Sequence, residues 1–126
     1  MKNNLKDKVA YITGGSKGIG YGVAKAMLAQ GMRVAITSRN LEAAKEAAAT
    51  LSTDPAKVLA LKSNVSSLAD EAKAIAATIG QFGQLDVLIA NAGVGHFDSI
   101  ENLSEAEWKE TIDTNLTGVF HSVKAS

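Results

Sequence analysis

The chain has 126 residues, 46% of them hydrophobic, which is enough for one core but not for two independent domains. Thirteen basic and thirteen acidic residues cancel, so no net charge favours nucleic acid or an anionic membrane as a partner. The sequence has no cysteine, which excludes disulfides, thiol catalysis and cysteine zinc sites, and we expect no other metal site. Without a membrane-length apolar run or a signal-peptide pattern, the simplest expectation is a cytoplasmic protein.

Four short apolar runs alternate with helical patterns along the chain. We expect strands at Val9–Ile12, Val34–Thr37, Val58–Leu61 and Leu85–Ala90. Strands that alternate with helices are typical of an α/β fold with a parallel sheet. No linker or repeat interrupts this order, so residues 1–126 are expected to form a single domain or part of one.

The segments between and after the strands predict four helices, each bounded by a suitable residue. These are Ile19–Gln30 closed by Gly31, Leu41–Leu51 capped by Asn40, a helix from Ser66 or Ser67 to about Gly80–Gly83, and a helix that starts at Ser104. Ser104 is followed three residues later by Glu107, which matches a capping box.

An apolar stripe runs along the last helix at three- and four-residue steps. Its members are Trp108, Ile112, Leu116, Val119, Phe120 and Val123. Such a stripe is typical of a helix face that is buried, so we expect it to pack on the sheet.

The stretch Thr13-Gly14-Gly15-Ser16-Lys17-Gly18-Ile19-Gly20 joins the first strand to the first helix. A glycine-rich turn in this context lets the backbone approach a pyrophosphate, and the helix N-terminus offers free N–H groups. A phosphate-binding P-loop needs Gly-Lys-Ser/Thr, whereas Lys17 here precedes a glycine. The turn therefore predicts dinucleotide binding, although glycines in isolation also mark ordinary turns.

The second strand ends in Thr37-Ser38-Arg39-Asn40, without the acid that usually binds the adenosine ribose of NAD. A carboxylate would repel a ribose 2′-phosphate, whereas a guanidinium can bind it in a fork geometry. Lys17 adds a second positive charge on the glycine turn. This pattern predicts NADP(H) as the cofactor; the alternative is that both cations are merely solvated.

Three motifs together resemble the short-chain dehydrogenase/reductase family: the glycine turn, Asn91-Ala92-Gly93 after the fourth strand, and Asn115 within Asp113-Thr114-Asn115-Leu116-Thr117-Gly118. The resemblance implies a Rossmann-type doubly wound sheet in strand order 3-2-1-4. It also implies that Gly14, Ser16, Lys17, Gly18, Ile19 and Gly20 surround the phosphates, that Ser38, Arg39 and Asn40 lie near the adenosine ribose, and that Asn64 and Val65 flank the adenine. Asn91, Ala92 and Gly93 would support the sheet and approach the cofactor's ribose, and Asn115 would be the active-site asparagine.

Members of this family move a hydride between nicotinamide and a carbonyl or alcohol carbon. The resemblance places the catalytic serine and the Tyr-x-x-x-Lys pair beyond the helix that contains Asn115. Tyr21 and Lys25 have the spacing but follow the phosphate turn, so we do not expect them to be catalytic. Of the two histidines, His96 could face substrate, although an isolated loop histidine is more often structural or solvated, and His121 is expected at the surface.

We therefore expect the cofactor-binding, N-terminal portion of an NADP(H)-dependent oxidoreductase, one that cannot catalyse the reaction alone. The alternatives are a noncatalytic dinucleotide-binding module and a structural assembly unit. In strand order 3-2-1-4 the fourth strand has an open edge, although Leu85–Ala90 has the composition of an interior strand. That edge predicts a homo-oligomer, a complementing polypeptide or poor solubility.

Overall fold

The computed structural model describes residues 4–95 and 98–126. Four strands, β1 (Val9–Ile12), β2 (Arg33–Ser38), β3 (Val58–Lys62) and β4 (Val87–Ile89), form a parallel sheet in the order β3-β2-β1-β4. The α/β fold and the predicted strand order 3-2-1-4 are confirmed. The strand β4 is shorter than the predicted Leu85–Ala90 because only three of its residues pair with β1.

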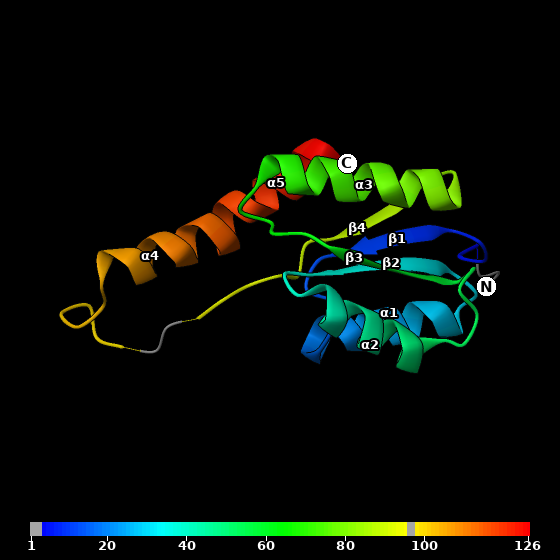
Figure 1. Cartoon of the computed structure of the whole chain (residues 1–126), viewed down its shortest axis with the longest axis horizontal. Helices are drawn as coiled ribbons and strands as arrows, with labels where there is room; N and C mark the ends of the chain where they lie inside the picture. Colours follow the sequence, from blue (N-terminus) through cyan, green and yellow to red (C-terminus); the bar gives the residue numbers. More distant parts are fainter. Residues whose placement is uncertain (1–3, 96–97) are drawn as a thin grey trace.

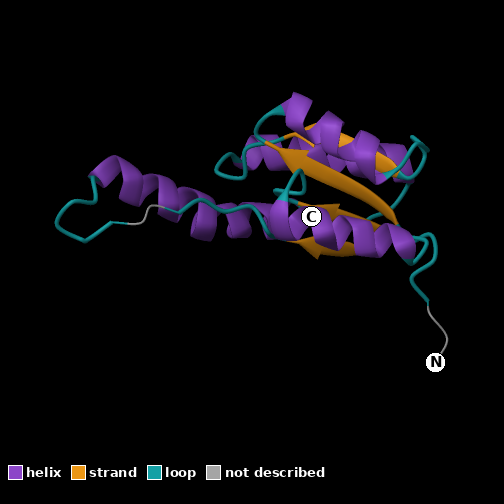
Figure 2. Ribbon diagram, turned by 90° about the horizontal axis from the view of Figure 1, so that it is seen from below, coloured by secondary structure: helices purple, strands orange, loops and turns teal. Residues whose placement is uncertain are grey.

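Helices cover both faces of the sheet. Figure 1 shows α1 (Gly18–Ala29) and α2 (Leu41–Leu51) on one face, and α3 (Leu68–Phe82) with α5 (Gly118–Ala125) on the other; Figure 2 shows the same layers after a quarter turn. Because side chains alternate along a strand, Ala10 and Ile12 of β1 join the core under α1 and α2. Val9 and Tyr11 join the core under α3. The strand β1 is therefore buried on both faces, as a central parallel strand should be.

The predicted capping residues are confirmed for three helices. Asn40 accepts hydrogen bonds from the N–H groups of Glu42 and Ala43 at the start of α2. Ser67, rather than Ser66, caps α3, which ends at Gly83 in the left-handed conformation. Ser104 accepts from the N–H of Glu107 at the start of α4 (Glu105–Ile112).

The predicted last helix is in fact three consecutive segments. The α-helix α4 passes into a π-helical turn, η1 (Asp113–Thr117), and then into α5. Gly118 follows η1 at a point of close approach, since a Cβ there would lie 2.6 Å from Cγ2 of Val65. Within the described ranges, no helix is long and apolar enough to cross a membrane.

The expectation that the apolar stripe packs on the sheet is wrong. Trp108, Leu116 and Phe120 are 56%, 66% and 59% exposed, and Val119 and Val123 are also exposed. The buried residues of η1 and α5 are instead Thr114, Gly118 and Ser122. These small residues let α5 lie against α3, which already covers that face of the sheet, and Figure 1 shows α4 projecting away from it.

A buried carboxylate links the layer of α3 and α5 to the sheet. The side chain of Glu71 on α3 is fully buried and accepts from the hydroxyls of Tyr11 at 2.6 Å, Ser63 at 2.6 Å and Ser122 at 2.5 Å. Burial, reinforced by the hydrogen bond to Glu71, raises the pKa of Tyr11 well above its ordinary value of 10, so this hydroxyl remains a donor. The cluster joins β1, the end of β3, α3 and α5 through one side chain.

Asp86 fastens the start of β4 to β1. Its carboxylate accepts from the N–H of Val9 at 2.8 Å and from Nε2 of Gln84 at 2.6 Å, while its own N–H donates to the carbonyl of Val9. The hydrogen bond from the Val9 N–H holds the pKa of Asp86 below its ordinary value of 3.8.

We expect Glu71→Ala to lower the free energy of unfolding by about 2–4 kcal/mol, because three hydroxyls lose their buried acceptor. Urea denaturation followed by circular dichroism measures this change. The matched control is Glu46→Ala on the exposed face of α2, for which we expect a change within about 0.5 kcal/mol. Equal effects of the two substitutions would contradict the structural role of Glu71.

We expect Asp86→Asn to be destabilising at pH 7 and to lose that effect as the pH falls. Since the pKa of Asp86 is lower in the folded chain than in the unfolded chain, the carboxylate stabilises the fold above pH 3.8. This contribution disappears as the pH falls through the lower pKa of the folded state. Urea denaturation of both proteins from pH 7 down to pH 3 tests the prediction, which fails if the two curves stay parallel.

Candidate functional site

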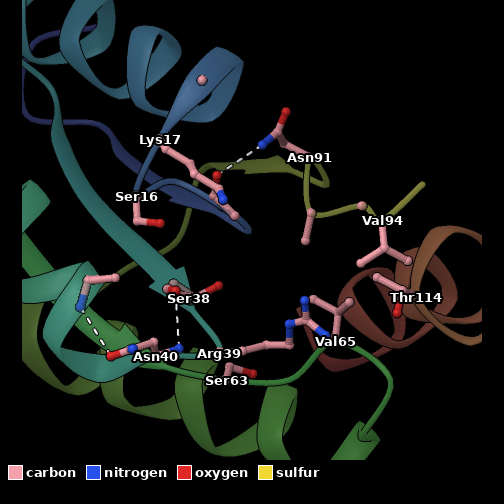
Figure 3. Close-up of a pocket in the computed structure, with 16 residues that line it drawn as sticks. Ser16, Lys17, Ser38, Arg39, Asn40, Ser63, Val65, Asn91, Val94 and Thr114 are labelled. Atoms are coloured by element: carbon pink, nitrogen blue, oxygen red, sulfur yellow. Dashed lines mark hydrogen bonds between the residues drawn. The ribbon is translucent and has the colours of Figure 1, made fainter. Parts of the chain in front are cut away.

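A cavity of about 570 Å³ opens at the carboxyl ends of the strands. Parallel strands end at the same edge of the sheet, and β1 lies where the chain connections diverge, between β2 and β4. Figure 3 shows side chains from several separate turns around this opening. The lining residues are Gly14, Ser16, Lys17, Gly18, Thr37, Ser38, Arg39, Asn40, Ala43, Ser63, Val65, Asn91, Ala92, Gly93, Val94 and Thr114.

The turn between β1 and α1 forms one wall and leaves the start of α1 open. Gly14 and Gly18 have φ values of 64° and 61°, which favour glycine, and a Cβ on Gly18 would meet no atom within 4 Å. No side chain in the described part of the chain caps α1, whereas side chains cap α2, α3 and α4. The first N–H groups of α1 are thus available to an anion.

Side-chain hydrogen bonds connect the end of β4 to the end of β1. Oγ1 of Thr13 accepts from the N–H groups of Asn91 and Ala92, both at 3.0 Å. Nδ2 of Asn91 donates to the carbonyl of Thr13 at 3.2 Å and to that of Gly14 at 3.1 Å, the second of which is drawn in Figure 3. A Cβ on Gly20 would lie 2.5 Å from Nδ2 of Asn91, so glycine there permits this contact. Asn91 thereby fixes the shape of the glycine turn.

The end of β2 forms the wall that carries Arg39. Oγ of Ser38 accepts from the N–H of Asn40 at 3.2 Å, and Oδ1 of Asn40 is used to cap α2. The Arg39 side chain is 59% exposed and its Nη1 lies 3.6 Å from Oε1 of Glu110 on α4. No carboxylate is among the described residues that line the cavity, so its walls are neutral or positive.

The end of β3 contributes Ser63 and Val65 but not the Asn64 side chain. Oδ1 of Asn64 accepts from the N–H of Ser66 at 3.0 Å and its hydroxyl at 2.6 Å. The carbonyl of Val65 lies 2.7 Å from Nδ1 of His121. His121, expected at the surface, is half-buried, because this contact draws its ring toward the loop after β3.

Asn115 ties η1 to the loop that follows β4. Its Oδ1 accepts from the N–H of Val94 at 2.8 Å and its Nδ2 donates to the carbonyl of Val94 at 2.7 Å. Asn115 does not itself line the cavity, although its neighbour Thr114 does. A π-helical turn that carries such an asparagine is the kind of irregularity often found at functional sites.

The structure gathers eleven of the predicted site residues around the cavity and places four outside its lining. Those outside are Ile19, Gly20, Asn64 and Asn115, of which Ile19 is 80% exposed and Gly20 is packed in the turn. Sequence reasoning missed Thr37, Ala43, Ser63, Val94 and Thr114. Thr37 ends a predicted strand and Ser63 follows another by two residues, so both could have been found from their position. Thr114 precedes Asn115 in the motif that resembles the family, but nothing in that motif singled out its side chain. His96 lies outside the described residues.

Neither Tyr21 nor Lys25 is among the described residues that line the cavity. The hydroxyl of Tyr21 lies 2.9 Å from Oγ1 of Thr50 on α2. Tyr21 thus links two helices on one face of the sheet and does not line the cavity.

Comparisons with known proteins agree with this geometry. Residues 8–126 match the model of the short chain dehydrogenase family. The chain is 36% identical over 126 residues to 2-(S)-hydroxypropyl-CoM dehydrogenase 3 of Xanthobacter autotrophicus, covering 100% of this chain and 49% of that protein. It is 36% identical over 124 residues to cyclohexanol dehydrogenase of an Acinetobacter species, covering 98% and 49%.

A solved structure of similar fold is 3-ketoacyl-(acyl-carrier-protein) reductase from Brucella melitensis complexed with NADH. It has a TM-score of 0.90 and 32% identity, and the match covers 96% of this chain and 49% of that one. The chain therefore spans about half the length of these relatives. With its family motifs, strand order and cavity all in agreement, the chain belongs to the short-chain dehydrogenase family.

Proposed function

We propose that residues 1–126 form the NADP(H)-binding part of an oxidoreductase that transfers hydride between nicotinamide and a carbonyl or alcohol substrate. The observation that carries the choice of cofactor is the composition of the cavity wall. Lys17 and Arg39 both line the cavity, and no carboxylate does so among the described residues. Positive groups there favour a 2′-phosphate, which an acid at the end of β2 would repel.

The shape of the cavity fits a dinucleotide. The uncapped N-terminus of α1 and the open space above Gly18 would receive the pyrophosphate, with Gly14, Ser16, Ile19 and Gly20 completing the turn. Ser38, Arg39 and Asn40 would hold the adenosine ribose and its phosphate, and the loop of Asn64 and Val65 would flank the adenine. Asn91, Ala92 and Gly93 would contact the other ribose. The presence of NADH in the similar Brucella reductase supports this assignment of a nicotinamide dinucleotide.

When bound, the nicotinamide dinucleotide supplies or accepts the hydride, so the polypeptide must orient the substrate carbon and manage a proton. We assign Asn115 a part in ordering the active site, because its amide holds the Val94 main chain at the cavity wall. The groups that move the proton are proposed to come from polypeptide outside residues 1–126. This segment alone would then bind cofactor without turnover.

Two alternatives make different predictions for the natural chain. A noncatalytic dinucleotide-binding module would bind NADPH but would reduce no carbonyl compound in a panel of substrates. A structural assembly unit would bind neither NADPH nor NADH. Titration calorimetry with both cofactors, followed by assays of NADPH oxidation, separates these outcomes.

We expect Arg39→Asp to weaken NADPH binding about 10- to 100-fold relative to NADH, because charge-assisted hydrogen bonds to a phosphate are replaced by repulsion. Titration calorimetry of both cofactors measures the ratio of the two dissociation constants. The control is Lys73→Asp on the exposed face of α3, which changes the net charge equally away from the cavity. An unchanged ratio in Arg39→Asp would refute NADP(H) selectivity through this residue.

We also propose that further polypeptide, a second copy or a complementing chain, covers the open edge of β4. Among the described residues β4 pairs with β1 alone, and α4, η1 and α5 carry exposed apolar residues. An unpaired strand edge and an exposed apolar face both favour association.

We expect sedimentation velocity of residues 1–126 to show association that increases with concentration. Phe120→Glu should weaken this association, since it places a charge among exposed apolar side chains, whereas Lys124→Glu on the same helix should have less effect. A monomer over the whole concentration range would contradict the proposal.

A further inference from the structure

An acid of the chain itself lies beside the guanidinium that we assign to the 2′-phosphate. Arg39 follows β2, and Glu110 lies on α4, far away in the sequence. Nη1 of Arg39 and Oε1 of Glu110 are 3.6 Å apart, and their side chains are 59% and 44% exposed. Arg39 also lines the cavity (Figure 3), so its ion pair with Glu110 connects α4 to the cavity wall formed by the end of β2.

The ion pair between Arg39 and Glu110 contributes little free energy. At 3.6 Å it is longer than a charge-assisted hydrogen bond, and water and salt screen two half-exposed charges. A phosphate dianion carries more charge than a carboxylate and offers three acceptor oxygens that match the guanidinium fork. A 2′-phosphate that reaches Arg39 would therefore displace Glu110 or share the guanidinium with it.

We propose that Glu110 is a specificity-determining residue that competes with the 2′-phosphate of NADP(H) for Arg39. This inference rests on the proposed binding of a nicotinamide dinucleotide at the cavity. NAD(H) has a hydroxyl at that position and leaves the pair intact, so Glu110 weakens the binding of one cofactor and not of the other. The ratio of NADP(H) affinity to NAD(H) affinity is therefore smaller than it would be if Arg39 had no acidic neighbour.

The position of Glu110 on α4 allows its carboxylate to be changed without disturbing the core. The helix α4 has no buried residue, so a substitution on its surface leaves the core unchanged. The preceding residue, Lys109, forms an ion pair with Asp113 one turn later. Glu105 is exposed on the same helix near its start and provides a control with the same change of charge.

The test is a double-mutant cycle on the natural chain, with dissociation constants for NADPH and NADH measured by titration calorimetry at low salt. We expect Glu110→Gln to tighten NADPH binding about two- to fivefold, the range of an exposed ion pair, and to leave NADH binding unchanged. Glu105→Gln should change neither constant. In an Arg39→Gln background, Glu110→Gln should no longer tighten NADPH binding, because the group in competition is gone.

Several results would overturn the inference. In Glu110→Gln, weaker NADPH binding would do so, as would an unchanged ratio of the two dissociation constants. Tighter NADPH binding of the same size in the Arg39→Gln background as in the wild type would also do so. Absence of binding by either cofactor would overturn it together with the proposed function. A wild-type chain that prefers NADH would refute the proposed selectivity alone, since a shift toward NADPH in Glu110→Gln would still support the competition.

Discussion

The cavity depends on the junction between Thr13 at the end of β1 and Asn91 at the end of β4. Its side-chain hydrogen bonds are all donated from the β4 side: the Asn91 and Ala92 N–H groups donate to Oγ1 of Thr13, and the Asn91 amide donates to the carbonyls of Thr13 and Gly14. Gly14 and Gly20 have no room for a side chain because this junction occupies the space. The direction of α1, and with it the position of its open N-terminus, follows from these contacts.

The other side of the cavity depends on how the loop after β3 packs against α3 and α5. Val65 meets Gly118 and His121, and Glu71 joins Ser63 to Ser122, so the loop after β3 is fastened to α5 from two directions. These contacts set where η1 and α4 lie relative to the end of β2. They explain how a residue of α4 comes within reach of Arg39, and why charges on that helix bear on the choice of cofactor.

Local patterns predicted most of the fold because local physics controls it. The bounds of β1 and the caps Asn40, Ser67 and Ser104 were predictable, since an apolar run and a capping side chain act over a few residues. The stripe of Trp108, Phe120 and their neighbours led to the wrong expectation that this face packs on the sheet, because tertiary packing decides which face of a helix is buried. Periodicity shows that a helix has an apolar face, but here small residues on the opposite face fit against α3.

The sequence by itself determined the α/β fold, the strand order through its family motifs, the glycine turn and the absence of an acid after β2. The glycine turn and the missing acid are short local patterns, and the strand order follows from the sequence of motifs along the chain, so none of them requires knowledge of distant contacts. Only the tertiary structure decided which residues meet: Thr114 at the cavity, Glu71 among three hydroxyls, and Glu110 beside Arg39. Such contacts join segments that are far apart in the chain. They depend on how the helices and loops pack together, and no local sequence pattern encodes that packing.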